Sequence, residues 1–302
     1  MPSTKITISD RVKGPDLLVR HWPAGDNAFA SLLIVHGLGE HSGRYEHVGE
    51  RLAADGVHVH AYDQRGFGGS GGPRAYVDTW DDIFDDLEER LAAVRTTAPD
   101  LPAVLYGHSL GGLIALAYTL LDRPKPDLLV LSAPGLEDRL PGWKRQLARV
   151  LDRVAPRLLV NNGIAEDQLA ADPRPDFVYD DDPLMENRST VRFGALGFAN
   201  QAGARRTIEA LEHLPVPTLV IHGADDPIVP ITASALLERF PEVRRIVYPG
   251  LRHEVHNEND SRALADIVAW LREQVDDPAG DATARKAATG SPRAAVLESG
   301  SN

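Results

Sequence analysis

Short runs of apolar residues recur along the chain, and each run has the length of a strand buried inside a sheet. Most of the runs are followed by Gly, Asp or Pro, which favour turns. Continuous apolar runs of this length are typical of strands covered on both faces. The runs are Ser31–Val35, Val57–Tyr62, Pro102–Tyr106, Asp127–Leu131, Pro217–His222 and Arg244–Tyr248.

Longer segments with apolar residues at helical spacing separate these runs. They are Arg44–Ala54, Thr79–Arg95, Leu110–Leu121, Ile231–Phe240 and Ser261–Val275. Strands that alternate with helices predict an α/β fold with a mostly parallel sheet and helices on both of its faces. The first twenty residues alternate instead like an antiparallel hairpin, with a turn near Lys13-Gly14-Pro15.

The alternation stops after Pro134 and resumes near Leu214. The intervening residues are rich in Pro, Asp and Arg, and their apolar periods are helical. We therefore expect residues 135–214 to form a cap inserted between two parts of a core, 1–134 and 215–275. Residues 276–302 are mostly Ala, Gly, Ser, Asp and Arg without an aromatic residue, which predicts a disordered tail.

Charge and composition exclude several classes of protein. The 302 residues carry a formal net charge of −12, which disfavours binding to the phosphates of nucleic acids. There is no cysteine, so disulfides, thiolate catalysis and Cys-ligated metals are excluded. The first residues lack the apolar segment of a signal peptide, and no run of about 18 apolar residues occurs. We expect a cytoplasmic protein.

A candidate nucleophile lies in Gly107-His108-Ser109-Leu110-Gly111, which matches the pattern G-x-S-x-G. An apolar strand precedes this motif and a helical run follows it. A strand that enters a helix through so tight a turn needs glycines beside the serine, because a Cβ there would clash. The serine hydroxyl would then stand at the carboxyl end of a strand and at a helix N-terminus, where a developing anion is stabilised.

A second loop provides a candidate oxyanion hole. His36-Gly37 directly follows the run that ends at Val35. In hydrolases with this elbow, one amide of that loop and the amide after the nucleophile bind the oxyanion. The two donors would be the backbone amides of Leu38 and Leu110, and we expect the His36 side chain to hold the loop.

A catalytic triad of this class runs in the order Ser, Asp or Glu, then His along the chain. Asp225 and Asp226 follow the run that ends at His222, and either could orient an imidazole. His253 and His256 follow the last apolar run, and either could be the base. The spacing alone leaves one residue to be chosen from each pair.

Longer motifs make a family resemblance visible. They are HGLGEHSGRY (His36–Tyr45), DQRGFGGS (Asp63–Ser70), GHSLGG (Gly107–Gly112), YDDDPL (Tyr179–Leu184) and YPGLRHEVH (Tyr248–His256). The chain resembles the monoacylglycerol lipase or lysophospholipase-like branch of the α/β-hydrolases, whose members are often labelled serine aminopeptidase S33. The resemblance covers about residues 14–275. It implies an eight-stranded, mostly parallel sheet with helices on both faces and a helical cap.

The resemblance also implies site residues. The acid of the G-x-x-D pattern is Asp226, and the base is His253, the first histidine of the H-x-x-H pair. Together with Ser109 they would cleave carboxylic esters through an acyl-enzyme, without a cofactor or metal. The positions that hold a glycerol head group are Glu40, Arg44 and His256, and Tyr179 matches a cap tyrosine that lines the same pocket.

These four residue types favour a monoacylglycerol, a small lipid ester, as the substrate. The loop after the second parallel strand departs from the family at Gln64-Arg65 and Phe67, and residues 136–168 match the family poorly. The resemblance therefore does not predict which acyl chain is preferred. The alternatives are a short-chain carboxylesterase, a lysophospholipase, a peptidase and a non-catalytic binding module. A peptidase would need an acidic group for a substrate amine, for which only Glu40 is a candidate.

Residues 143–160 combine an apolar stripe with basic side chains. The apolar positions are Trp143, Leu147, Val150, Leu151, Val154 and Leu158, and the basic ones are Lys144, Arg145, Arg149, Arg153 and Arg157. Such a helix can rest on a membrane surface, with Trp143, Leu147 and Leu151 as the expected contacts. The alternative is that the stripe packs on the core of the cap itself.

Overall fold

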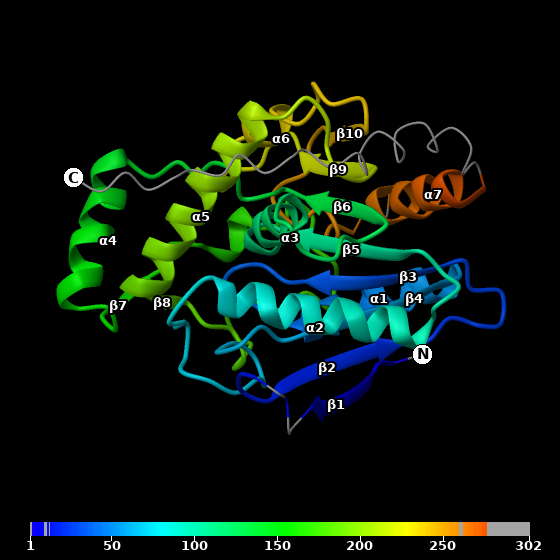
Figure 1. Ribbon diagram of the computed structural model, residues 1–302, viewed down its shortest axis with the longest axis horizontal. Coiled ribbons are helices and arrows are strands. Elements are labelled where there is room, and N and C mark those ends of the chain that lie inside the picture. Colours follow the sequence, from blue (N-terminus) through cyan, green and yellow to red (C-terminus); the bar gives the residue numbers. More distant parts are fainter. Residues whose placement is uncertain (1, 9–10, 12, 260–261, 277–302) are drawn as a thin grey trace, which may run out of the picture.

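The central sheet has eight strands in the order β1-β2-β4-β3-β5-β6-β9-β10 (Figure 1). The computed structural model describes residues 2–8, 11, 13–259 and 262–276. β2 pairs antiparallel with β1 and β4, and every later pairing is parallel. The strands are β1 (Thr4–Ile8), β2 (Leu17–Trp22), β3 (Ala30–Val35), β4 (Val57–Tyr62), β5 (Ala103–His108), β6 (Leu128–Ser132), β9 (Thr218–Gly223) and β10 (Val243–Tyr248). The predicted sheet and N-terminal hairpin are confirmed.

Helices cover both faces of this sheet. The helices are η1 (Ser42–Tyr45), α1 (Glu46–Ala54), α2 (Asp81–Thr97), α3 (Leu110–Leu120), α4 (Gly142–Val154), η2 (Glu166–Gln168), α5 (Val191–Ala210), α6 (Thr232–Ala235) and α7 (Arg262–Asp276). α1 and α7 pack on one face with Trp22 and Tyr45, and α2 and α3 pack on the other. The long apolar runs of the strands are thereby buried on both sides, as their composition predicts.

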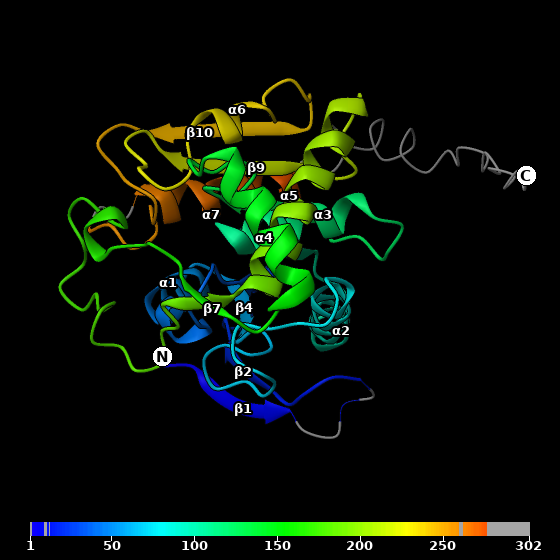
Figure 2. The ribbon, with the colours of Figure 1, turned by 90° about the vertical axis from the view of Figure 1, so that its left-hand side faces the viewer.

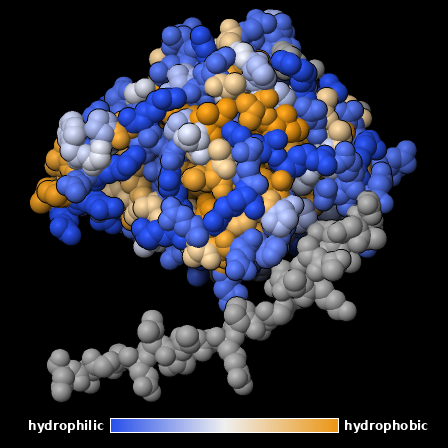
Figure 3. Space-filling model, turned by 90° about the horizontal axis from the view of Figure 1, so that it is seen from above, coloured by the Kyte–Doolittle hydropathy of each residue, from blue (hydrophilic) through white to orange (hydrophobic). Residues whose placement is uncertain are grey.

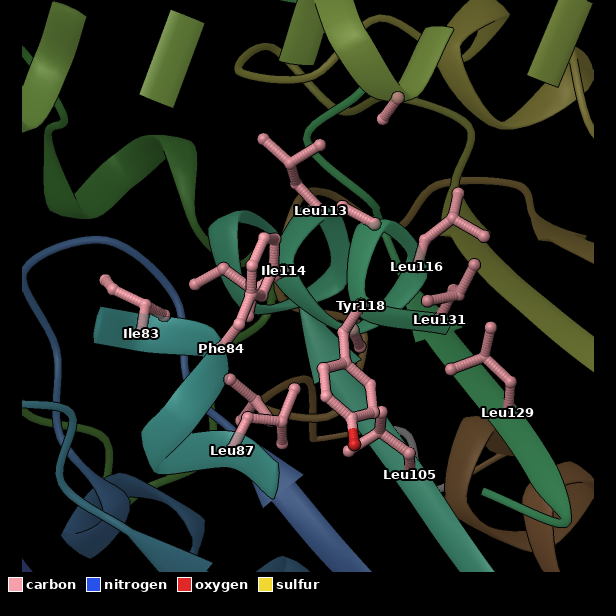
Figure 4. Close-up of a cluster of buried hydrophobic side chains, with 14 of the residues drawn as sticks. Ile83, Phe84, Leu87, Leu105, Leu113, Ile114, Leu116, Tyr118, Leu129 and Leu131 are labelled. Carbon is pink, nitrogen blue, oxygen red and sulfur yellow. The ribbon is translucent and has the colours of Figure 1, made fainter. Parts of the chain in front are cut away.

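The larger core cluster lies between the sheet and α2 and α3. Figure 4 shows Ile83, Phe84 and Leu87 of α2 facing the α3 side chains, with Leu105 and Leu129 of the sheet beneath. Leu87 and Leu105 are fully buried. This packing fixes α3, and with it the turn between β5 and α3, relative to the sheet.

A long segment between β6 and β9 leaves the sheet. It contains α4, α5 and a small antiparallel pair, β7 (Leu159–Asn161) with β8 (Arg188–Thr190). Figure 2 shows α4 and α5 in front of the sheet when the molecule is seen from that end. Residues 135–214, for which we predicted a cap, make up this segment. The predicted tail lies outside the described residues beyond Asp276.

Two helices end earlier than the sequence pattern predicts. The helical spacing of residues 143–160 continues beyond α4, but the helix ends at Val154 because Pro156 disfavours the helical conformation at the residue before it. The helix expected over Ile231–Phe240 is only Thr232–Ala235. After it the chain forms hydrogen bonds between residues three apart, such as Leu237 N–H to Ser234 O at 3.1 Å, and these are turns.

No helix in the described part of the chain combines the length and the apolar character that crossing a bilayer requires.

Candidate active site

Ser109 occupies a strained turn between β5 and α3. Its backbone has φ 53° and ψ −116°, a conformation that side-chain-bearing residues rarely adopt. The flanking glycines permit the turn, because a Cβ on Gly111 would lie 2.1 Å from the Val35 carbonyl oxygen and one on Gly107 would lie 2.3 Å from the Gly111 carbonyl oxygen. The predicted strand–turn–helix context of the G-x-S-x-G motif is therefore present.

The loop after β3 passes beside this turn. A Cβ on Gly37 would lie 3.3 Å from the Ser109 Cβ, and the Gly37 amide donates to the Glu40 carboxylate. The Leu38 amide makes no hydrogen bond to any described residue. Leu110 is the first residue of α3, so its amide has no acceptor within the helix. Two backbone donors thus remain available next to Ser109.

His36 holds this loop through its ring, as expected. Its Nε2 accepts the Gln64 amide at 2.9 Å, so the proton is on Nδ1, which lies 2.9 Å from the Gly37 carbonyl oxygen. The ring is fully buried, and burial lowers the pKa of His36. Gln64 also donates to the His36 carbonyl oxygen at 2.6 Å, so this departure from the family motif provides a second support for the loop.

The loops after β9 and β10 bring a carboxylate and an imidazole together. His253 Nδ1 lies 2.7 Å from Asp226 Oδ2, and both side chains are almost fully buried. The neighbouring Asp225 side chain is exposed instead. The His253 ring lies 4.7 Å from the ring of His108, the residue before Ser109, which places His253 beside the turn.

Each member of this pair controls the ionisation of the other. Burial opposes charge on both groups. The charge and hydrogen bonds of His253 and His222 nevertheless hold the pKa of Asp226 well below its usual range. Burial likewise lowers the pKa of His253, but the charge and hydrogen bond of Asp226 outweigh it and raise that pKa above the usual 6.5. The site therefore holds an ionised carboxylate against a basic imidazole.

A buried cluster of charged residues lies next to the turn. Arg44 Nη1 donates to Glu40 Oε2 at 3.0 Å and to Glu254 Oε1 at 2.8 Å, and its Nη2 donates to Glu254 Oε2 at 3.0 Å. The Tyr45 hydroxyl donates to Glu40 Oε1 at 2.9 Å. Two carboxylates share one guanidinium here. Burial raises the pKa of Glu254, but the charge and hydrogen bonds of Arg44 outweigh burial and hold that pKa well below its usual range.

His256 completes the cluster and keeps one unused polar atom. Its ring stacks on Tyr45 at 5.0 Å and lies 4.7 Å from His108. Its Nδ1 lies 3.4 Å from the Tyr106 hydroxyl, whereas its buried Nε2 has no hydrogen-bond partner among the described residues. Burial lowers the pKa of His256 well below 6.5, so the ring is neutral.

The segment between β6 and β9 covers this cluster and is attached to both loops. The rings of Phe177 and Tyr179 lie 5.2 and 5.3 Å from the Arg44 guanidinium. His41 Nε2 lies 2.8 Å from Asp182 Oδ2, and the Glu186 amide donates to the Gly39 carbonyl oxygen at 2.7 Å. These contacts fix the cap residues over the loop that follows β3.

The structure brings all of the predicted site residues to one region. Four further residues of this region were not predicted: Glu254, Phe177, Asn257 and His222. Glu254 and Asn257 directly follow the predicted histidines. Their place beside these histidines in the last loop is the only feature of the sequence that could have indicated them. His222 is the penultimate residue of β9, where the sequence pattern indicates only a buried strand residue.

Comparisons with known proteins agree with this geometry. The family described as "Serine aminopeptidase, S33" matches residues 26–260. A monoacylglycerol lipase of Mycolicibacterium smegmatis is 31% identical over 269 residues, which cover 86% of this chain and 94% of the relative. A crystal structure of a monoacylglycerol lipase of Paleococcus ferrophilus aligns with a TM-score of 0.74 at 29% identity and covers 85% of this chain and 98% of the other.

A soluble variant of monoglyceride lipase from Saccharomyces cerevisiae has the same fold, with a TM-score of 0.78 at 20% identity over 90% of this chain and 96% of the other. The predicted α/β-hydrolase fold and the prediction of a carboxylic ester hydrolase are confirmed. The chain therefore belongs to the serine aminopeptidase S33 family of α/β-hydrolases, in agreement with the resemblance of its motifs.

Proposed function

We propose that the protein hydrolyses monoacylglycerols through an acyl-enzyme on Ser109. His253 removes the proton from the Ser109 hydroxyl as its oxygen attacks the ester carbonyl. The amides of Leu38 and Leu110 stabilise the oxyanion, and one such donor typically contributes about 3 kcal/mol. His253 then protonates the leaving alcohol, and water releases the fatty acid by the same route.

One observation supports this mechanism above all: the strained Ser109 turn lies beside the buried His253–Asp226 pair. Asp226 remains ionised throughout and fixes the imidazole with its free nitrogen toward the serine. The pair needs no metal or cofactor to generate the nucleophile.

The charged cluster supports a polyhydroxylated leaving group. We propose that Glu40, Arg44 and His256 bind the glycerol hydroxyls, with Tyr179 of the cap closing the pocket. Unused donors or acceptors in a buried site favour a ligand that satisfies them, and His256 Nε2 is such an atom. The relatives named monoacylglycerol lipase point in the same direction.

A peptidase activity fits the cluster less well. A substrate ammonium group would need a carboxylate free to pair with it. Glu40 accepts hydrogen bonds from Gly37, Arg44 and Tyr45, and Glu254 is held by both nitrogens of Arg44 and by Asn257. The charge of both carboxylates is therefore already paired with Arg44, so a substrate ammonium finds no free counter-charge, whereas a hydroxyl needs only the acceptor position that remains on Glu40.

A substrate series tests this proposal. We expect monoacylglycerols of medium and long chain to be hydrolysed with higher kcat/KM than matched p-nitrophenyl esters. Glu40→Gln keeps an oxygen that can accept the Gly37 amide, so it should change the p-nitrophenyl esters little. It should reduce kcat/KM for the glycerol esters by about tenfold or more, because a hydrogen bond to a charged group is lost. Preference for short activated esters, with Glu40→Gln equal to wild type on glycerol esters, would favour the general esterase instead.

We further propose that residues 135–214 act as a cap and that α4 places it on an anionic lipid surface. Trp143, Leu147, Val150 and Val154 recur every three or four residues and are 62%, 45%, 56% and 74% exposed. Figure 3 shows hydrophobic residues at the surface on the left-hand side, where Figure 1 places α4. This stripe does not pack on the cap core.

The opposite side of α4 contacts the rest of the cap. Asp152 pairs with Arg192 of α5 at 2.6 Å on this side, and Leu151, which we expected at the membrane, is half-buried between this side and the exposed stripe. Val150 and Val154 take its place in the exposed stripe. Lys144 flanks the stripe on one side and Arg149 and Arg153 on the other, so positive charge surrounds it.

Vesicle sedimentation tests the membrane proposal. Phosphatidylcholine vesicles that contain phosphatidylglycerol should bind the protein more tightly than phosphatidylcholine alone. The double variant Leu147→Ser, Val150→Ser should weaken binding about tenfold or more, since each buried aliphatic side chain is worth about 1.5–3 kcal/mol. Ile6→Ser on β1 removes a similarly exposed side chain and is the matched control. Equal binding of the double variant and this control would contradict the proposal.

A further inference from the structure

A second histidine contacts the carboxylate that orients His253. His222, in β9, is fully buried, and its Nε2 lies 3.0 Å from Asp226 Oδ2. The same oxygen lies 2.7 Å from His253 Nδ1. Two imidazoles therefore share one carboxylate oxygen, and only one of them is used by the proposed mechanism.

The hydrogen bonds of His222 define where its proton is. Nε2 faces two acceptors, Asp226 Oδ2 and the Val229 carbonyl oxygen at 3.2 Å, so it carries a hydrogen. Nδ1 lies 2.8 Å from the Ser234 hydroxyl of α6. Arg245 of β10 donates to that hydroxyl oxygen at 2.9 Å.

The Ser234 hydroxyl donates to the Ile231 carbonyl oxygen at 3.1 Å. Its oxygen, which Arg245 also contacts, holds Nδ1 of His222 at 2.8 Å. With Nδ1 held in this way, the ring presents its Nε2–H to Asp226.

This donor completes the surroundings of Asp226. An ionised carboxylate offers about four acceptor positions. The amides of Ile228 and Val229 donate to Oδ1 at 2.8 and 2.9 Å, and His253 and His222 occupy Oδ2. With every position filled and the group buried, the carboxylate has one orientation.

We propose that His222 is a positioning residue for ester hydrolysis: its Nε2–H holds Asp226 Oδ2 against His253. The inference rests on the proposed roles of Ser109, Asp226 and His253. Loss of the donor makes Asp226 more basic, and a more basic carboxylate stabilises the protonated form of His253. Both effects move the acid limb of activity to higher pH.

Two substitutions at one position separate this role from packing. His222→Leu keeps the apolar volume and removes the N–H, whereas His222→Gln can place an amide N–H where Nε2 stands. His222→Leu should reduce kcat about tenfold and leave KM within about twofold of wild type. This loss of kcat is small compared with the loss expected when Asp226 itself is replaced. The acid limb of its pH profile should move up by about one pH unit, because the free energy of one hydrogen bond to a charged group corresponds to about one pKa unit. His222→Gln should restore both.

Thr119→Val is the control for a buried polar group removed elsewhere. Thr119 is fully buried in α3 and donates to the Ala115 carbonyl oxygen at 2.8 Å. The substitution Thr119→Val should lower the midpoint of thermal unfolding and leave the pH profile of activity unchanged. A His222→Leu enzyme with the wild-type kcat and pH profile would overturn the inference, as would a folded His222→Gln enzyme as impaired as His222→Leu.

A measurement without turnover separates this inference from the proposed function. In the Ser109→Ala background, NMR titration of His253 should give a higher pKa for His222→Leu than for the parent, and an unchanged pKa for His222→Gln. If no ester is hydrolysed but this shift is found, the proposed function fails and the positioning role stands. If monoacylglycerols are hydrolysed and His222→Leu leaves the His253 pKa unchanged, the positioning role fails alone.

Discussion

At the scale of single residues, the ionisation of His253 decides in the proposed mechanism when the site is active. The imidazole must be neutral to remove a proton from Ser109. Burial alone would keep it neutral to low pH, but the Asp226 carboxylate at 2.7 Å outweighs burial and raises its pKa. The group that orients the base thus also determines the lowest pH at which it works.

This balance predicts the acid limb of the pH profile. His253 with a raised pKa is protonated, and inactive, at pH values where an ordinary histidine is already neutral. We expect kcat/KM to fall as the pH decreases, with a midpoint above 6.5. A titration of kcat/KM with a soluble ester whose own charge is constant measures it. A midpoint below 6.5 would mean that burial, rather than Asp226, dominates.

Some site residues could be predicted from sequence and others could not, for a physical reason. Ser109, Asp226 and His253 follow the ends of strands, and the carboxyl ends of parallel strands meet at one edge of a sheet. The contact of Arg44 with Glu254 joins residues 210 positions apart, and no local pattern reveals it. His222 lies inside a strand, where a buried histidine resembles any other core residue until its partner is known.

At the scale of elements, glycine decides how closely α3 approaches β3. A Cβ on Gly111 would lie 2.1 Å from the Val35 carbonyl oxygen, so backbone would have to move. Gly194, inside α5, has no atom within 4 Å of the same position. The two glycines are similar in the sequence but differ entirely in what surrounds them.

Alanine at these two positions should therefore have opposite effects. We expect Gly111→Ala to lower the free energy of unfolding by about 2 kcal/mol or more, as overpacking against backbone does. Gly194→Ala should raise it by about 0.5–1 kcal/mol, because alanine favours the helix. Urea denaturation followed by circular dichroism measures both. A Gly111→Ala protein as stable as wild type would show that the close approach is not required.

The sequence pattern predicted which helices and strands form better than it predicted the residues at which the helices end. The spacing of apolar residues continues through Pro156, but the missing amide of a proline and its effect on Ala155 end α4. At α6 the Ser234 side chain is bound to His222 and Arg245, and four-residue turns follow. Hydrophobic periodicity reports which side chains are buried and does not report where the backbone stops being helical.

At the scale of the whole molecule, three distant parts of the chain meet at the site. The loop after β3, the loops after β9 and β10, and the cap between β6 and β9 all reach the carboxyl edge of the sheet. His41 and Gly39 attach to the cap through Asp182 and Glu186. The order of elements predicted an insertion in the chain, whereas its placement over the site depends on these tertiary contacts.

The proposed membrane contact also lies on the cap, on the side of α4 that points away from the rest of the cap. The exposed stripe of α4 is basic at its edges in a chain of net charge −12, so we expect the proposed contact to orient the molecule with α4 toward an anionic surface. The proposed membrane contact and the residues over the site would then belong to one segment of the chain, residues 135–214.

Covalent labelling tests the central claim, that Ser109 is activated by His253 and Asp226, most directly. The protein is treated with a fluorophosphonate, and the intact mass and the labelled peptide are measured. We predict one adduct per chain on Ser109, none in Ser109→Ala, and labelling at least about a hundredfold slower in His253→Ala, since a positioned base contributes about 10²–10⁴ in rate. An adduct on another residue, or labelling of Ser109 at the wild-type rate in His253→Ala, would contradict the account.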